Sequence, residues 1–141
     1  MNVEFVYNTG FKINDETKIT SWINSFCKKE GFIIESLVFA FFTDEDLKGL
    51  NIRFLNHDFY TDVISFDESN NSFIKGNIAI SVDRVNDNAC TFSSLFDDEL
   101  KRVIIHGVLH LMGFKDKTDE EKSLIREKED SAIEMLSLIH I

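Results

Sequence analysis

Two histidines four residues apart, His106 and His110, stand in the stretch HGVLHLMGFKDK (106–117). On a helix, side chains at this spacing share one face with their Cβ atoms about 5–6 Å apart, so both imidazoles could reach one metal ion. Two ligands do not make a stable site, and a third donor is required. The HxxxH pattern alone is weak, because it also suits hydrogen-bonded histidines at the rim of a core.

Gly113 offers a route for a third donor. Three residues past His110, it favours a left-handed helix end after which the chain doubles back. Asp116, six residues past His110, is then well placed to return to the metal, although a solvated turn residue or cap is an equal alternative. Asp119 and Glu120 are less favoured donors, because they fall early in the next helix.

The residues around the histidines limit the chemistry. His106 is followed by Gly107, where metalloproteases of the HExxH type carry the glutamate that acts as general base. A protease would therefore lack its base, and Gly107 is better explained by close packing of this helix against a neighbour. Arg102 stands one turn before His106 in the same row, and Glu99 lies on nearly the same side.

The helix that carries these residues is expected to begin at Ser94 with Asp97, a capping-box-like pair. Its apolar stripe comprises Leu100, Val103, Ile104, Gly107 and Leu111. Before it, the patterns predict strands at 3–7, 32–42, 62–66 and 73–83, a helix capped by Asp15, and a helix from Thr43 to Leu55. A last helix from Thr118 would bury Ile125, Ala132 and Leu136.

These elements predict one α+β domain over residues 1–141, in which helices pack on a mixed sheet of about four strands. The 43% hydrophobic and 28% charged content fits an ordered globule. No apolar run approaches the roughly 20 residues of a membrane span, and the start carries no leader pattern, so we expect a cytoplasmic protein without membrane contact. The net charge of −10 argues against a broad nucleic-acid-binding surface.

The motifs resemble those of the YbeY endoribonuclease family, which acts in maturation of the ribosomal small-subunit RNA. The similarity includes the HGxLHLxG core from His106 to Gly113, the LN..F...D..TDVISF segment from Leu50 to Phe66, GNIAIS from Gly76 to Ser81, Asn88-Ala89, and Glu99. It covers most of the chain from residue 33 to about 130. The resemblance implies an α+β fold, a zinc ion held by three histidines, and metal-dependent cleavage of RNA.

Carried over by position, the first two ligands of the family are His106 and His110, and its third histidine falls on Asp116. Two histidines and one carboxylate are an established catalytic zinc set that leaves a fourth position for water. The carboxylate removes one unit of positive charge, so the bound water should be a somewhat weaker acid. The same set also suits manganese or iron.

A second departure concerns the catalytic cation. Members of the family commonly have Tyr-Arg where this chain has Phe54-Leu55, and that arginine is thought to contribute to catalysis. Leu55 cannot stabilise phosphate charge. Arg102 is the favoured replacement, and Lys115 or Lys117 could also approach the phosphate, although each could equally be a solvated surface residue.

The expected function is that of a single-strand-specific, metal-dependent endoribonuclease in 16S rRNA 3′-end maturation and ribosome quality control. Water activated by the metal would attack the phosphodiester, with Glu99, Asp116 or the hydroxide itself as base. Because RNA affinity comes largely from phosphate neutralisation, the acidic chain needs either a local basic cleft or a ribosome-associated protein that delivers the RNA, and the second is favoured. The alternatives are a non-catalytic ribosome-assembly factor with a structural metal, and a hydrolase of another phosphoester or amide.

The remaining polar residues of interest are two histidines and the TDVISF segment. His57 and His140 are expected to be solvated and not to bind metal. In the TDVISF segment, Thr61, Asp62 and Ser65 could face a cleft, although turn-capping and edge polarity are their commoner roles.

Overall fold

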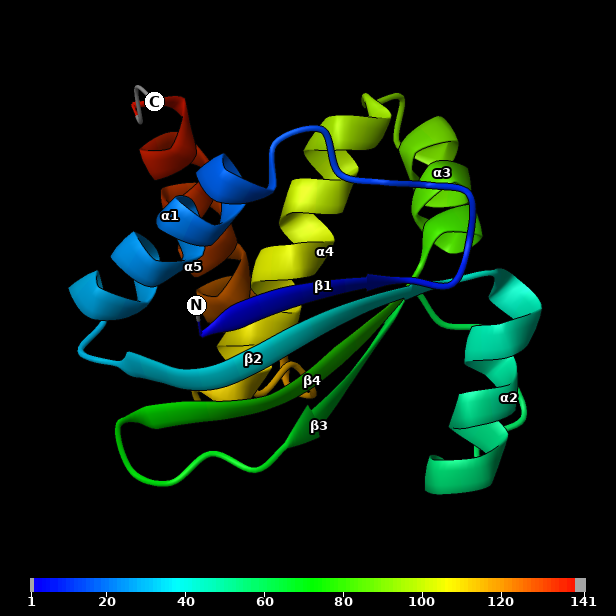
Figure 1. The fold of residues 1–141 in the computed structure, drawn as a ribbon, viewed down its shortest axis with the longest axis horizontal. Coiled ribbons are helices and arrows are strands. Elements are labelled where there is room, and N and C mark those ends of the chain that lie inside the picture. Colours follow the sequence, from blue (N-terminus) through cyan, green and yellow to red (C-terminus); the bar gives the residue numbers. More distant parts are fainter. Residues whose placement is uncertain (1, 139–141) are drawn as a thin grey trace.

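The computed structural model describes residues 2–138, in which a four-stranded sheet lies between helices (Figure 1). The strands are β1 (Val3–Tyr7), β2 (Ile33–Phe42), β3 (Val63–Asp67) and β4 (Phe73–Ser81). The helices are α1 (Glu16–Lys29), α2 (Asp44–Leu55), α3 (Val82–Thr91), α4 (Phe96–Leu111) and α5 (Asp119–Ser137). His140 lies outside the described residues.

The sheet is mixed and has the strand order β1-β2-β4-β3. β1, β2 and β4 run parallel, whereas β3 pairs antiparallel with β4 at the edge. The predicted central position of the 32–42 strand is confirmed, because β2 pairs with a neighbour on each side. The predicted α+β class with four strands is also confirmed.

The two faces of the sheet are covered differently. Alternate β4 side chains such as Ile78 point into the main core, which α1, α4 and α5 cover. On the other face, Leu47 of α2 packs with Ile64 and Ala79 in a much smaller cluster. Figure 1 shows α2 apart from the layer formed by the other long helices. The long helix α4 crosses β3 and β4 on the main-core face and thereby places both histidines beside the sheet edge.

Local sequence signals set most helix starts. Asp15 caps α1 as predicted, and Thr43 and Thr118 cap α2 and α5 at the residues where these helices were expected to begin. Each side chain accepts a hydrogen bond from a backbone N–H three residues on. In α5 the side chain of Glu121 also returns to the Thr118 N–H, which completes a capping box. These side chains satisfy backbone donors that have no partner within the helix.

Two predicted boundaries are wrong. The strand expected to reach residue 83 ends at Ser81, whose hydroxyl accepts from the Arg84 N–H and begins α3, a helix that the sequence patterns did not predict. The helix α4 begins after Leu95, without a side-chain cap, and not at Ser94. The Ser94 N–H instead donates to the Ala89 carbonyl and closes the end of α3.

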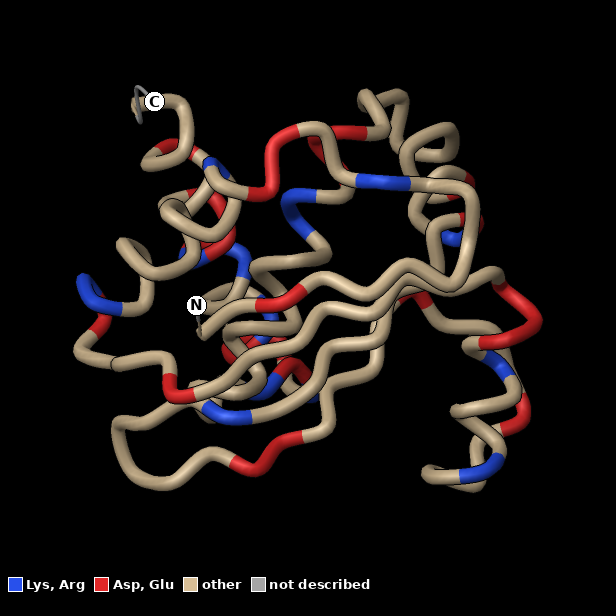
Figure 2. The backbone as a smooth tube through the Cα atoms, in the orientation of Figure 1, with Lys and Arg blue, Asp and Glu red and all other residues tan. Residues whose placement is uncertain are grey.

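Charged residues gather on the helices and loops, whereas the strands are mostly uncharged (Figure 2). This distribution fits a sheet that is buried along much of its length. Within residues 2–138, no helix combines the length and the apolar character needed to cross a membrane.

Gly76 provides a test of how β4 is packed. An added Cβ there would collide with the Phe66 backbone oxygen and would lie 3.3 Å from the Leu111 side chain, so Gly76→Ala should lower the free energy of unfolding by about 1–3 kcal/mol. Gly49→Ala in α2 meets nothing within 4 Å and should raise stability slightly, because alanine favours helix. Urea unfolding of both variants measures the difference, and equal stability would contradict the packing argument.

Candidate metal centre

Three potential ligand atoms converge where α4 ends and the chain turns toward α5. The Nε2 atoms of His106 and His110 lie 2.9 Å apart. The Asp116 Oδ2 atom lies 3.3 Å from the first and 3.6 Å from the second. Tetrahedral zinc ligands are about 3.3–3.4 Å from one another at the usual metal–ligand lengths. The three side chains could therefore hold one metal ion with small adjustments.

The turn after α4 brings Asp116 to the histidines. Gly113 has φ +103, in the left-handed region, and the Phe114 N–H donates to the Leu109 carbonyl. The predicted reversal of the chain at Gly113 is confirmed. The carboxylate reaches the imidazoles from outside the helix, as the spacing of six residues from His110 suggested.

Hydrogen bonds at the other ring nitrogens orient both imidazoles. The Nδ1 atom of His106 lies 2.6 Å from Glu129 Oε2, and Nδ1 of His110 lies 2.9 Å from the Phe114 carbonyl oxygen. Carboxylate and carbonyl oxygens only accept, so both Nδ1 atoms donate and the Nε2 atoms of neutral rings carry lone pairs. Two such lone pairs at 2.9 Å repel unless a proton or a metal ion lies between them.

Glu129 is the most buried carboxylate at this centre, with 4% of its surface exposed. Arg102 donates to it at 2.8 Å and to the exposed Asp130 at 2.9 Å. Burial alone would raise the pKa of Glu129, but the hydrogen bonds from His106 and Arg102 hold it below its usual value. The carboxylate therefore stays ionised and can hold the His106 ring in place.

The pKa of His106 responds to the same neighbours. Burial lowers this pKa, but the hydrogen bond to Glu129 and the charges of Glu129 and Asp116 outweigh burial and raise it above its usual value. The surroundings of His106 therefore favour positive charge, which is the electrostatic condition for binding a cation.

Sequence reasoning missed Glu129. Its only signal is its place in α5, where it stands in the apolar row formed by Ile125, Ala132 and Leu136, all buried. A carboxylate on a core-facing stripe needs a partner, because burying an unpaired charge is costly. The sequence did not indicate which partner, since His106 lies 23 residues away.

Gly107 allows α4 to approach the sheet, as predicted. A Cβ at this position would lie 2.8 Å from Ile78 Cγ2 and 3.4 Å from Ser65 Oγ. The Ser65 hydroxyl donates to the Gly107 carbonyl at 3.2 Å. Close packing here sets the distance between the histidine helix and β3.

A cavity lies on each side of the ligand cluster. The His106-side cavity, about 300 Å³, is lined by Asp62, Glu99, Arg102, Val103, His106, Asp116, Lys122, Ile125, Arg126 and Glu129. The His110-side cavity, about 350 Å³, is lined by Asn51, Leu55, His57, Phe59, Thr61, Val63, Ile64, Ser65, Asp67 and His110. The structure thus brings Glu99 and Arg102 to one side of the cluster and Leu55 to the other.

The TDVISF residues divide between these cavities, with Asp62 in the first and Thr61 and Ser65 in the second. Lys115 and Lys117 are exposed and line neither cavity. His57 is exposed, as expected, and stands outside the ligand cluster.

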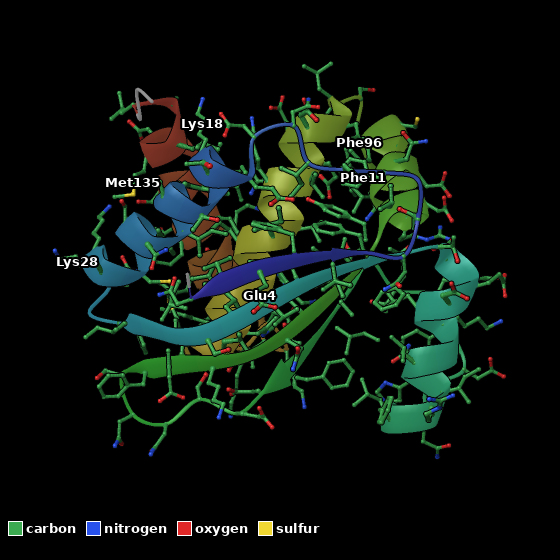
Figure 3. The ribbon with its side chains drawn as sticks, in the orientation of Figure 1. Glu4, Phe11, Lys18, Lys28, Phe96 and Met135 are labelled. Atoms are coloured by element: carbon green, nitrogen blue, oxygen red, sulfur yellow. The ribbon has the colours of Figure 1, made fainter. Side chains whose placement is uncertain are left out.

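A larger cavity, about 450 Å³, lies away from the histidines, at the ends of α1, α4 and α5. Phe11 and Phe96, both labelled in Figure 3, line this cavity. Their ring centroids lie 5.5 Å apart. Its lining residues include neither His106 nor His110, so cavity size alone would misplace the chemistry.

Comparison with known proteins decides the family. The family model described as endoribonuclease YbeY matches residues 6–137. The chain belongs to the YbeY endoribonuclease family. The endoribonuclease YbeY of Christiangramia forsetii is 42% identical over 139 residues, covering 99% of this chain and 95% of that protein. That of Cytophaga hutchinsonii is 45% identical over 132 residues, covering 93% and 92%.

The same fold is also found in a solved structure. The solution structure of TM1509 from Thermotoga maritima superposes with a TM-score of 0.70 at 25% identity, covering 95% of this chain and 88% of that one. The resemblance drawn from the HGxLHLxG motif is confirmed, and membership in the YbeY family supports an endoribonuclease activity.

Metal content tests the ligand set. The wild-type protein should hold about one metal ion per chain, and both His110→Ala and Asp116→Ala should lose it, because two remaining ligands do not hold an ion firmly. Elemental analysis of folded, desalted protein gives the stoichiometry. Asp119→Ala, outside the cluster, is the matched control and should keep its metal. Metal retained by Asp116→Ala would place the third donor elsewhere.

Glu129→Gln tests the carboxylate behind His106. The amide keeps the size of the side chain but weakens the acceptor for the imidazole N–H, so the metal dissociation constant should rise about 10–100-fold. Competition with a chromophoric chelator measures it. Glu127→Gln, exposed on the same helix, should bind metal as the wild type does. Equal affinity for Glu129→Gln would show that Glu129 serves packing alone.

Proposed function

We propose that the protein is a metal-dependent endoribonuclease that cleaves single-stranded RNA. The observation that supports this most directly is the convergence of His106, His110 and Asp116 between two cavities in a chain of the YbeY family. Among the described residues, no fourth His, Cys, Asp or Glu joins this cluster. A three-ligand set leaves room for water or substrate, as in catalytic and unlike structural zinc sites.

The ion we propose is one zinc, with manganese or iron as alternatives that the same ligands suit. When bound, it would supply Lewis acidity toward a phosphoryl oxygen and acidify a water molecule. Glu129 and the Phe114 carbonyl hold the two imidazoles with Nε2 toward Asp116, so the ligands need little rearrangement. This preorganisation is what the chain itself contributes to metal binding.

We propose that Glu99 acts as the general base. This half-buried carboxylate lines the His106-side cavity, where burial raises its pKa and the nearby negative charge of Asp62 raises it further. A carboxylate whose pKa is moved toward neutrality is a better base at cellular pH. Glu99 would take a proton through a water molecule, and Asp116 is the alternative base next to the reacting phosphate.

We propose that basic side chains of α4 and α5 stabilise the negative charge of the phosphate. Arg102 remains a candidate, although its guanidinium is bound to Glu129 and Asp130 and would act chiefly by holding Glu129 and by its charge. Lys122 and Arg126 line the same cavity, and within residues 2–138 neither has a carboxylate within 4.0 Å. These two cations could contact phosphate without breaking an existing ion pair, and they offset the absence of arginine at Leu55.

The biological substrate we propose is ribosomal RNA of the small subunit, in 16S 3′-end maturation and ribosome quality control in the cytoplasm. The net charge of −10 opposes broad electrostatic capture of RNA. A ribosome-associated protein that presents the RNA would overcome this repulsion. The family assignment and the acidity of the chain support this proposal together.

A non-catalytic ribosome-assembly factor is the second candidate, and Leu55 favours it. This apolar side chain lines the His110-side cavity at a position where the family commonly has arginine. In such a factor the metal would only stabilise the turn between α4 and α5.

RNA cleavage by His110→Ala distinguishes the two candidates. We expect this variant to retain its fold and to lose cleavage, because a ligand of the proposed ion is gone. Naked single-stranded RNA and small subunits carrying unprocessed rRNA should be tested side by side, with faster cleavage of the subunits in the wild type. Unchanged cleavage by the folded variant would refute the enzyme, and Glu127→Gln is the control for surface changes.

A further inference from the structure

The His110-side cavity contains aromatic rings that the metal chemistry does not use. We propose that it binds an unstacked base of the RNA substrate, and that the ring pair of His57 and Phe59 is the surface on which this base stacks. The inference rests on the proposed function and adds how the nucleotide beside the scissile phosphate is held.

The cavity adjoins the ligand cluster through His110, which belongs to both. Its volume of about 350 Å³ lies in the range of small-ligand sites. Leu55, His57 and Phe59 supply apolar and aromatic surface, and Thr61 and Ser65 supply hydroxyl groups. A base placed there would be adjacent to a phosphate at the cluster.

The two rings form a ready stacking surface. The His57 and Phe59 centroids lie 5.1 Å apart with an interplanar angle of 19°, and 52% of the Phe59 surface remains exposed. Exposed, parallel aromatic rings beside a cavity offer the π-surface on which bases stack in single-strand-binding proteins. Every base has such a surface, so this contact tolerates different sequences.

A buried residue fixes this loop. Asn51 is only 1% exposed, and its side-chain Nδ2 donates to the Phe59 backbone carbonyl at 3.1 Å. The backbone carbonyl of Asn51 accepts a hydrogen bond from the His57 N–H at 3.1 Å. Between them Asn56 takes the left-handed conformation, with φ 56, and ends α2. Lys48 pairs with Asp58 in the same loop at 3.7 Å. The rings are therefore held before any ligand arrives, which lowers the entropic cost of binding.

Stacking also suits the electrostatics of the chain. A protein of net charge −10 gains little from general attraction to phosphates, and Leu55 adds no charge at this cavity. Base stacking contributes about 1–3 kcal/mol per base and needs no positive charge. The cations of the His106-side cavity would contact phosphate, and the aromatic pair of the His110-side cavity would contact the base.

Tryptophan fluorescence can detect the stacking directly. In Phe59→Trp, a short oligoadenylate added to metal-free protein should quench the new fluorophore in a saturable way. The only native tryptophan, Trp22, is fully buried, so the change belongs to position 59. Phe92→Trp is the matched control, because Phe92 is 68% exposed and lines neither site cavity, and it should show no saturable quenching.

Affinity gives a second measurement. Phe59→Leu should weaken binding of the labelled oligoadenylate about tenfold in fluorescence anisotropy, whereas Phe92→Leu should bind as the wild type does. No quenching at position 59, or wild-type affinity in Phe59→Leu, would overturn the stacking surface. Because these measurements use metal-free protein, they are independent of cleavage. If the metal-loaded wild type cleaves RNA but the Phe59→Trp variant shows no quenching, only the stacking proposal is refuted. If the variant shows quenching but the metal-loaded wild type does not cleave RNA, only the proposed nuclease activity is refuted.

Discussion

The hydrogen bond between Glu129 and His106 is the interaction on which the site depends. A carboxylate buried this deeply is tolerated only with partners, and it has two in His106 and Arg102. Both partners stand on α4, whereas Glu129 comes from α5. The same contact therefore joins two helices, fixes the tautomer of the histidine and sets the negative potential that a cation would meet. Stability of the helix pair and competence of the metal centre cannot be separated at this residue.

The position of α4 over the sheet is the second constraint. Gly107 lets the helix lie against Ile78 and Ser65, and the hydroxyl of Ser65 bonds to the Gly107 carbonyl. This packing sets the distance between α4 and the sheet. The loop that follows α2 and the edge strand β3 then form one side of the His110-side cavity, and His110 forms the other. Close packing in the core thus determines the width of a surface cavity.

The sequence predicted the parts of this structure that depend on near neighbours in the chain. The start of the last helix at Thr118, the reversal at Gly113 and the approach of Asp116 all follow from signals within a few residues. Glu129 could be recognised as a misplaced charge but not assigned a partner, because that partner depends on how two helices pack. The start of α3 at Ser81 was missed because an apolar strand pattern runs directly into a capping serine.

The two cavities differ in kind, and the ligand cluster lies between them. One is lined by three cations and four carboxylates, and the other by aromatic rings, hydroxyls and aliphatic surface, with Asp67 as its one carboxylate and Asn51 as its one amide. A strand lying across the cluster would thus meet unlike surroundings on its 5′ and 3′ sides. A base on one side of the cluster would meet the rings, and a phosphate on the other side would meet the cations. A bound strand would therefore be held by stacking on one side of the cleaved bond and by charge on the other.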